Sequence, residues 1–475
     1  MRIRKTKVVA TIGPSSDDPA VLDKMLHAGM DVARLNVSHG TLEEHKARIE
    51  RLRAASSRTG RNIALMLDTR GLEIRTGKLE SGAVVLRAGE FFKLYLDGRA
   101  GSREGVSVSH QNLAAEVALG DAILIDDGKI ELEVIATRRE EIETRIECGG
   151  TLRSQKSVNL PGNVLSLERL SERNREDLKF AASHEIDYVA ASFVQSSEDV
   201  EQIVGFLAEC GVQIPIIAKI ENSLGVENLE AIVEIAQGVM VARGDLGVEV
   251  PMAEVPVIQK KIIRATVSSG KPVVTATQML DSMERNPRPT RAEVSDVANA
   301  ILDGSSAVML SGETAAGRYP VESVEVMAAL ALEAEMSLDE YGYLQQIAPD
   351  PSNVVAEAVS QAAITMSTHL NAAAIVCLTD SGRTARRISK YRPGCPIYAV
   401  AESAKVIRRL SMNWGVFPVP FEGPGFDTQK VEAAIRWGTE KGYLRPGDVI
   451  VATGSTHGSS AEPDKSTDMI RVIEI

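Results

Sequence analysis

The chain has 475 residues, of which 44% are hydrophobic and 25% charged, and its formal net charge is −12. This length exceeds what one ordinary core organises, so two or three domains are expected. The acidic balance and the aromatic content of 4% argue against a nucleic-acid surface. No apolar run reaches the roughly 18 residues that a membrane helix needs, so no membrane contact is expected.

The N-terminus, MRIRKTKVVATIGPSS, has an apolar part too short for a signal peptide. We interpret it as the first strand of the fold. The four cysteines are scattered without a CxxC pair. That spacing indicates reduced thiols in a cytoplasmic protein, with neither a zinc site nor a disulfide framework.

Short apolar runs alternate with amphipathic stretches over residues 1–71 and again over residues 157–338. Examples of the runs are KVVATIG, DVARLNVS, IALMLDTR, IDYVAASFV, IPIIAKIE, GVMVARGD, KPVVTATQ and SAVMLSGET. Such alternation predicts parallel strands joined by helical crossovers. Because the two segments together supply about eight strands, an α/β fold built on a (β/α)8 TIM barrel fits better than an open sheet.

Residues 72–156 break this alternation, because β-rich pieces such as DAILIDDGKIELEVI lie between glycine-rich and charged turns. We interpret this segment as an all-β domain inserted into the barrel. The alternation resumes over residues 339–475 in AAAIVCLT, CPIYAVAE, GVFPVPF and DVIVATGS. That segment predicts a separate C-terminal α/β domain.

The ends of the later barrel strands carry charged and hydroxyl groups, and reactive groups cluster at such ends in a parallel barrel. Lys219 and Glu221 lie two apart on one strand, so both face the same side. Asp245, beside Gly244, ends the next strand, and Thr277 ends the one after. Two carboxylates can hold a divalent ion, and an ammonium group can stabilise a developing anion. Each residue alone could be structural, but the set favours a catalytic site.

The earlier strand ends add a second polar set. The planar guanidinium of Arg34 matches phosphate oxygens. Four more side chains offer only oxygen ligands with one formal negative charge among them: Asn36, Ser38, Asp68 and Thr69. This donor set suits a large monovalent cation, although a turn network closing two strand ends is an alternative. The chain lacks a GxxxxGK[ST] loop and the protein-kinase motifs, so those mechanisms are not expected.

These motifs resemble those of the pyruvate kinase family. The family's active-site signature is matched by IPIIAKIENSLGV. Its other motifs are matched in order by ARLNVSHG, DTRGLEIR, KSVNLPG, MVARGDLGVE, VVTATQMLDSM, PTRAEVSDVANAILDG and VMLSGETAAGRYP. The resemblance covers nearly the whole chain. It implies magnesium-dependent phosphoryl transfer from phosphoenolpyruvate to ADP, giving pyruvate and ATP in the last step of glycolysis.

The resemblance also implies roles for the strand-end residues. Lys219 would stabilise the phosphoryl group in flight, and Thr277 would lie where the enolate receives its proton. Glu221 and Asp245 would hold Mg²⁺ or Mn²⁺. The phosphate would be bound by Arg34, and the substrate would be contacted by Arg34, Lys219, Gly244, Asp245 and Thr277.

Further ligands are implied by the same resemblance. Arg75 and Lys156, at the borders of the inserted domain, would reach the nucleotide phosphates, with His39 and Asn36 also near the nucleotide. The inserted domain would be a lid that excludes water. The K⁺ ion would be held by Asn36, Ser38, Asp68 and Thr69.

Four positions affect which properties of the family can be expected of this chain. Relatives with glutamate at the position of Glu73 tend to require potassium, whereas a lysine there supplies its own charge, so potassium dependence is expected. The chain has Arg70 for the usual lysine and Leu72 for the usual proline at the hinge of the lid. Arginine keeps the charge but not the shape of lysine. Gln195 stands where many relatives have arginine.

The C-terminal domain carries a candidate anion site at the start of TDSGRTARRISKY. A turn entering a helix N-terminus can bind an anion, although an ordinary helix cap has the same pattern. In the family this loop binds a phosphorylated allosteric effector, but the C-terminal loop TGSTHGSSAEPDKSTD is less like that of the family, so the response to an effector and its identity stay open. Most members are homotetramers, and a homotetramer is expected here. The residues concerned are Thr379, Ser381, Gly382, Arg383 and Thr384.

Two other classes are compatible with the strand-end residues. A metal-enolate aldolase or lyase acting on pyruvate could use Lys219 to form a Schiff base, which borohydride would trap. An inactive effector-binding protein is disfavoured, because the four residues Lys219, Glu221, Asp245 and Thr277 occur together.

Overall fold

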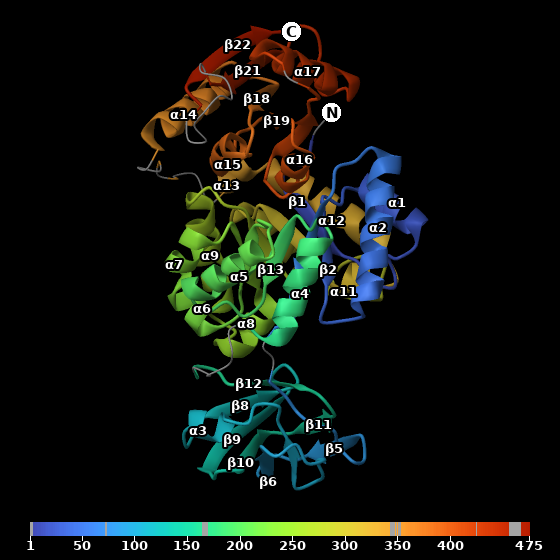
Figure 1. The fold of residues 1–475 in the computed structure, drawn as a ribbon, viewed down its shortest axis with the longest axis vertical. Coiled ribbons are helices and arrows are strands. Elements are labelled where there is room, and N and C mark those ends of the chain that lie inside the picture. The colour runs from blue at the N-terminus through green and yellow to red at the C-terminus, as the bar shows by residue number, and fades with distance from the viewer. Residues whose placement is uncertain are drawn as a thin grey trace.

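The computed structural model describes residues 3–71, 74–163, 170–342, 347, 349, 353–423, 425–455 and 467–475. A central barrel lies between a β-rich module and a C-terminal α/β domain (Figure 1). Within the described ranges, no helix has the length and apolar character needed to cross a bilayer.

The barrel is closed and all its strand pairs are parallel. Closure pairs the first strand with the last, Lys7 opposite Ala307. The predicted (β/α)8 fold is thereby confirmed. Its strands are β1 (Lys7–Thr11), β2 (Val32–Asn36), β3 (Ala64–Asp68), β13 (Tyr188–Ala191), β14 (Ile216–Ile220), β15 (Gly238–Ala242), β16 (Val273–Ala276) and β17 (Ala307–Leu310).

Amphipathic helices surround these strands and bury one face each against them. Local signals fix their ends: α2 begins with a capping box between Thr41 and Glu44 and stops at Gly60, whose φ is 64°. The outer helices are α1 (Pro19–Ala28), α2 (Leu42–Thr59), α4 (Glu172–Ser183), α5 (Ser197–Glu209), α7 (Leu229–Ile235), α9 (Val255–Ser268), α10 (Arg291–Leu302) and α12 (Pro320–Glu335).

Short helical turns come after several strands at the barrel mouth, which we define as the end where the strands finish. They are α6 (Ser223–Glu227), α8 (Arg243–Glu249), η1 (Asp281–Glu284) and α11 (Gly312–Ala315). Inside the barrel, the strands contribute a separate apolar core, and Met412 of the C-terminal domain packs into it from the opposite end.

The β-rich module leaves the barrel after β3 and has a hydrophobic core of its own. Its seven-stranded sheet has the order β4-β12-β8-β9-β10-β6-β7, and β5 pairs with β11. The elements are β4 (Ile74–Arg75), β5 (Ala83–Leu86), β6 (Phe91–Tyr95), β7 (Gly105–Ser107), α3 (Leu113–Glu116), β8 (Ala122–Ile125), β9 (Ile130–Thr137), β10 (Glu141–Cys148), β11 (Gly150–Arg153) and β12 (Ser157–Asn159).

Strand β12 lies beyond the boundary that the sequence predicts at residue 156. It pairs with β4 and β8, so residues 157–159 belong to the sheet of the module. The sequence does not reveal this, because SVN is too short to show alternation. The remaining domain limits stay predictions.

The C-terminal domain is a five-stranded sheet of order β20-β19-β18-β21-β22, in which only β22 is antiparallel. Helices α14, α15 and α16 pack on one face and α17 on the other. The elements are α13 (Leu338–Tyr341), α14 (Val354–His369), β18 (Ala374–Leu378), α15 (Arg383–Lys390), β19 (Ile397–Ala401), α16 (Ala404–Leu410), β20 (Val416–Pro420), α17 (Asp427–Glu440), β21 (Val449–Gly454) and β22 (Met469–Glu474).

The C-terminal domain docks on the end of the barrel where the strands begin, which we call the barrel base. Lys7 Nζ donates to the carbonyl oxygen of Val416 at 2.7 Å. Asp187, just before β13, accepts hydrogen bonds from Arg408 of α16 at 2.9 Å and from Arg53 of α2 at 3.1 Å. Charged groups therefore hold the two domains together.

Candidate active site

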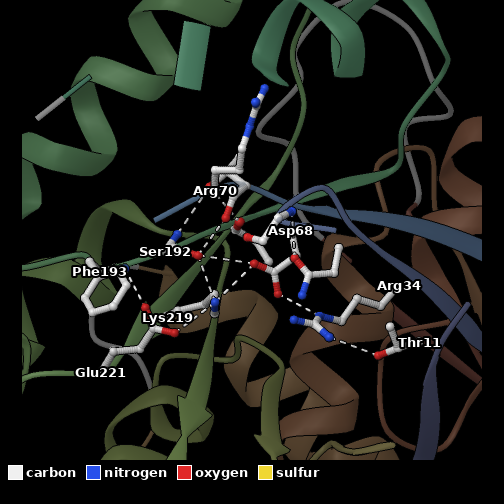
Figure 2. Close-up of polar contacts among 12 residues, drawn as sticks. Thr11, Arg34, Asp68, Arg70, Ser192, Phe193, Lys219 and Glu221 are labelled. Carbon is white, nitrogen blue, oxygen red and sulfur yellow. Dashed lines mark hydrogen bonds and ion pairs between the residues drawn. The ribbon is translucent and has the colours of Figure 1, made fainter. Parts of the chain in front are cut away.

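Four charged side chains form a continuous ion chain at the barrel mouth (Figure 2). Asp68 accepts from Arg34 Nε at 2.7 Å and from Lys219 Nζ at 3.1 Å. Lys219 Nζ also lies 2.8 Å from Glu221 Oε1. Each of the four residues is at most 8% exposed. Their charges are therefore poorly screened by water and act strongly on one another.

The ion chain shifts the pKa of its members in opposite directions. Burial alone would raise the pKa of Asp68, but Arg34 and Lys219 hold it below its usual value. Burial alone would lower the pKa of Lys219, but Asp68 and Glu221 raise it. Both groups therefore stay charged at neutral pH.

Glu221 is the acid with the least compensated charge. Burial raises its pKa to about 7, Lys219 opposes this rise, and Asp245 and Asp68 add to it. Its Oε2 accepts a hydrogen bond of 2.6 Å from the backbone N–H of Phe193. A cation between Glu221 and Asp245 would offset the repulsion of the two carboxylates.

The donor set at this point fits a hard divalent ion. Among the described residues, no three His, Cys, Asp or Glu side chains gather as a metal site. The charge of Asp245 acts on Glu221, so these two carboxylates could share a metal ion, and substrate or water would complete the shell. Mg²⁺ is commonly bound in this way, through one or two carboxylates plus phosphate oxygens and waters.

Thr277 comes directly after β16 at the same mouth and has a left-handed backbone, with φ of 69°. Its Oγ accepts a hydrogen bond of 2.8 Å from the N–H of Gly244, the residue before Asp245. The loops after β15 and β16 are thereby joined. The structure thus brings together the predicted Lys219, Glu221, Gly244, Asp245 and Thr277.

Of the four residues predicted to bind potassium, Asp68 is a member of the ion chain, and Asn36, Ser38 and Thr69 are the others. Asn36 and Asp68 are register partners on β2 and β3. Asn36 Oδ1 accepts from the N–H of Ser38 at 3.1 Å, and the Thr69 hydroxyl donates to Ala190 O at 3.3 Å. These four residues contribute oxygen atoms, the donor type that a hard cation requires.

A cavity of about 360 Å³ opens between the barrel mouth and the β-rich module. Arg75, Lys156 and Asp245 line it, whereas Asn36 and His39 do not. Lys156 Nζ is 2.8 Å from Asp126 Oδ1. Two of the four residues predicted to bind nucleotide therefore reach this space, and the other two lie outside it.

Arg70 has a defined structural partner. Its Nε donates to Asp177 Oδ1 at 3.0 Å, and its carbonyl oxygen accepts from Asn174 Nδ2 at 2.6 Å. Both partners belong to α4, so the strand that leads into the module is tied to the barrel wall. Leu72 and Glu73 lie outside the described residues. Gln195 lines the cavity, and its backbone N–H donates to Asp199.

The predicted effector residues gather at the start of α15. Thr379 Oγ accepts from the N–H of Gly382 at 2.9 Å, and Gly382 has a φ of 81°. Arg383 Nε donates to Ser381 Oγ at 3.3 Å. The Thr384 hydroxyl lies 2.7 Å from that of Thr467. Most of the C-terminal loop, residues 456–466, lies outside the described residues.

Sequence reasoning missed three members of the site. Ser192 accepts from Lys219 Nζ at 2.8 Å and donates to Asp68 Oδ1 at 3.2 Å. Phe193 supplies the backbone donor to Glu221, and Arg243 holds the loop of Thr277. Ser192 comes directly after β13, so the strand-end rule could have found it. The backbone donor of Phe193 leaves no trace in the sequence.

Comparison with known proteins identifies the family. Residues 3–324 match the family model described as pyruvate kinase, barrel domain, and residues 357–473 match pyruvate kinase, alpha/beta domain. The chain belongs to the pyruvate kinase family. It is therefore an enzyme, a phosphotransferase of glycolysis in a family that uses metal ions.

Bacterial pyruvate kinases resemble the chain over almost its whole length. The enzyme of Geobacillus stearothermophilus is 46% identical over 474 residues, which cover 99% of this chain and 80% of that protein. The enzyme of Bacillus licheniformis is 45% identical, and that of Staphylococcus epidermidis 43%, with the same two coverages.

Proposed function

We propose that the chain transfers the phosphoryl group of phosphoenolpyruvate to ADP, with Mg²⁺ or Mn²⁺ and K⁺ as cofactors. The observation that carries this proposal is the position of Lys219 between Asp68 and Glu221, with Asp245 and Thr277 at the same mouth. The bond between phosphorus and the enol oxygen breaks, and a new bond forms to a β-phosphate oxygen of ADP. The enolate then takes a proton at C3 to become pyruvate.

Lys219 and Arg34 supply fixed positive charge for the phosphoryl group. Asp68 holds both cations, so neither must reorganise when negative charge develops. Arg34 Nη1 also donates to Thr11 Oγ at 3.0 Å, which fixes the plane of the guanidinium. When bound by Glu221 and Asp245, a divalent ion would add positive charge at the enol and phosphoryl oxygens.

The remaining assignments extend this proposal. K⁺ binds among Asn36, Ser38, Asp68 and Thr69, and the nucleotide phosphates lie near Arg75 and Lys156, which line the cavity. A phosphorylated effector binds at the start of α15, and the enzyme is a cytoplasmic homotetramer. His39 and Asn36 contact the nucleotide only if it extends beyond the cavity wall.

The protonation state of Lys219 argues against the aldolase or lyase alternative. Schiff-base formation needs a neutral amine and so favours a lysine with a lowered pKa. The carboxylates around Lys219 raise its pKa instead. Transfer of an anionic phosphoryl group is the chemistry that a permanently charged ammonium group serves.

A coupled assay tests the function. Purified protein with phosphoenolpyruvate, ADP and Mg²⁺ should form pyruvate and ATP in equal amounts, and turnover should fall strongly when K⁺ is omitted. Borohydride with pyruvate should leave Lys219 unmodified. Absence of ATP formation, or a trapped adduct, would overturn the proposal, and full activity without monovalent cations would overturn the potassium assignment.

A further inference from the structure

Two consecutive residues at the end of β16 adopt a left-handed backbone. Thr277 has φ of 69° and Gln278 has φ of 54°. For a β-branched residue such as threonine this conformation is a genuine outlier. Strain of this kind persists only where surrounding contacts hold it, and it concentrates at functional sites.

Arg243 provides those contacts. Its Nη2 donates to Thr277 O at 2.7 Å, and its Nε donates to Ala276 O at 3.3 Å. Its Nη1 donates to Asp296 Oδ1 of α10 at 2.7 Å. The guanidinium group thus connects the strained loop to a helix of the barrel wall, and its side chain is only 13% exposed.

The hydroxyl group of Thr277 is oriented by the same arrangement. It donates to Ala276 O at 2.7 Å and accepts from the N–H of Gly244 at 2.8 Å. A hydroxyl has one proton and two lone pairs. The proton of Thr277 is already used, and one lone pair remains to accept a hydrogen bond from a water molecule at the mouth.

We propose that Arg243 is a positioning residue for protonation of the enolate, acting through Thr277. This inference rests on the proposed function. The C2=C3 electron pair of the enolate takes a proton from the water that Thr277 holds. The C2–O bond becomes a carbonyl, and the hydroxide left behind takes a proton from solvent. Arg243 touches none of these atoms, and it keeps the acceptor oxygen of Thr277 in place.

Two variants test the assignment. Arg243→Lys keeps the charge and loses the forked contacts, and Asp296→Asn weakens the anchor of Arg243. Arg58→Lys is the matched control, because Arg58 pairs with Asp23 on the barrel surface. Each protein is assayed for kcat and KM with phosphoenolpyruvate. Entry of deuterium into the methyl group of pyruvate is measured by NMR in D₂O with ATP, Mg²⁺ and K⁺, and phosphoenolpyruvate affinity by calorimetry.

In Arg243→Lys, kcat and deuterium entry should both fall about tenfold, with affinity for phosphoenolpyruvate unchanged within about twofold. Asp296→Asn should lose about threefold in both rates, and Arg58→Lys should lose nothing. Adding Gln278→Gly to Arg243→Lys should restore part of the rate, because glycine adopts positive φ without strain. A purely structural ion pair would not respond to this relief.

Deuterium entry at the wild-type rate in Arg243→Lys would overturn the inference, as would a loss explained entirely by weaker substrate binding. If Arg243→Lys does not fold, unchanged deuterium entry in Asp296→Asn overturns it equally. Failure of the proposed function is a separate result, namely no ATP formation by the wild-type protein.

Discussion

Both ends of the barrel bury an aspartate between two cations. At the mouth, Asp68 lies between Arg34 and Lys219. At the base, Asp187 lies between Arg53 and Arg408 and also accepts from the N–H of Leu65. The two arrangements differ in their surroundings, because the ion chain at the mouth continues into the buried acid Glu221, whereas the further acid at the base, Glu185, is exposed.

This difference indicates that the mouth serves reactivity and the base serves stability. The base has one buried acid for two arginines, so its carboxylate is fully satisfied. The mouth has the acids Asp68, Glu221 and Asp245 for the cations Arg34 and Lys219. The crowding of acids at the mouth raises the pKa of Glu221, and a metal ion there would offset their repulsion, whereas the base favours a closed domain contact. Barrel enzymes generally divide these roles between their two ends.

The largest expected effect comes from breaking the base. Asp187→Asn should lower the free energy of unfolding by about 3–5 kcal/mol, because the partly buried Arg53 and Arg408 would lose the buried carboxylate that they share. The turnover of folded enzyme should change little. Denaturant unfolding and steady-state assays measure the two quantities. Asp23→Asn, in an exposed pair with Arg58, is the control and should leave the midpoint nearly unchanged. If Asp187→Asn lost activity without losing stability, the assignment of a stabilising role to the base would be wrong.

A substitution in the ion chain at the mouth should lower turnover more than stability. Lys219→Met should lower kcat by roughly 10²–10³-fold, because a preorganised charge for the phosphoryl group is removed. Its unfolding midpoint should fall less than that of Asp187→Asn, because Arg34 still pairs with Asp68. Retention of more than about a tenth of wild-type turnover would show that the ion chain is not the reactive centre.

A smaller effect at the base depends on pH. Burial lowers the pKa of Lys7 from 10.5 to about 8. Between these values the unfolded chain binds more protons than the folded chain, so this residue makes stability rise with pH. From pH 7 to pH 10.5, the free energy of unfolding of the wild type should therefore rise by on the order of 2–3 kcal/mol relative to that of Lys7→Met.

Denaturant unfolding at the two pH values measures this difference. Lys46→Met, at an exposed position on α2, is the control for the loss of a lysine. The stability of the wild type relative to this variant should not change with pH in the same way. A wild type that gains no stability relative to Lys7→Met over this range would mean that burial does not lower the pKa of Lys7.

The strand-end rule found the principal site residues because local patterns mark them. Lys219, Glu221, Asp245 and Thr277 each stand where an apolar run stops, and closure of the barrel brings such ends together. The fold class was equally accessible, since strands buried on both faces appear as continuous apolar runs.

What the sequence could not predict depends on contacts between distant segments. The sequence suggests Asp68 as a potassium ligand, and only the structure shows it between Arg34 and Lys219. The left-handed backbone of Thr277 and its hydrogen bond from Arg243 leave no local signal in the sequence either. Distances across strands and backbone strain are properties of the assembled barrel.

The closing strand pair also decides how the protein can be made on the ribosome. Strand β1 cannot complete its pairing until β17 has been synthesised, because Lys7 pairs with Ala307 of that strand. The β-rich module emerges in between and has its own core, so it can fold early. Until β13 and β17 are made, the outer edges of β1 and β3 have no partner strand, and unpaired strand edges favour association with other chains.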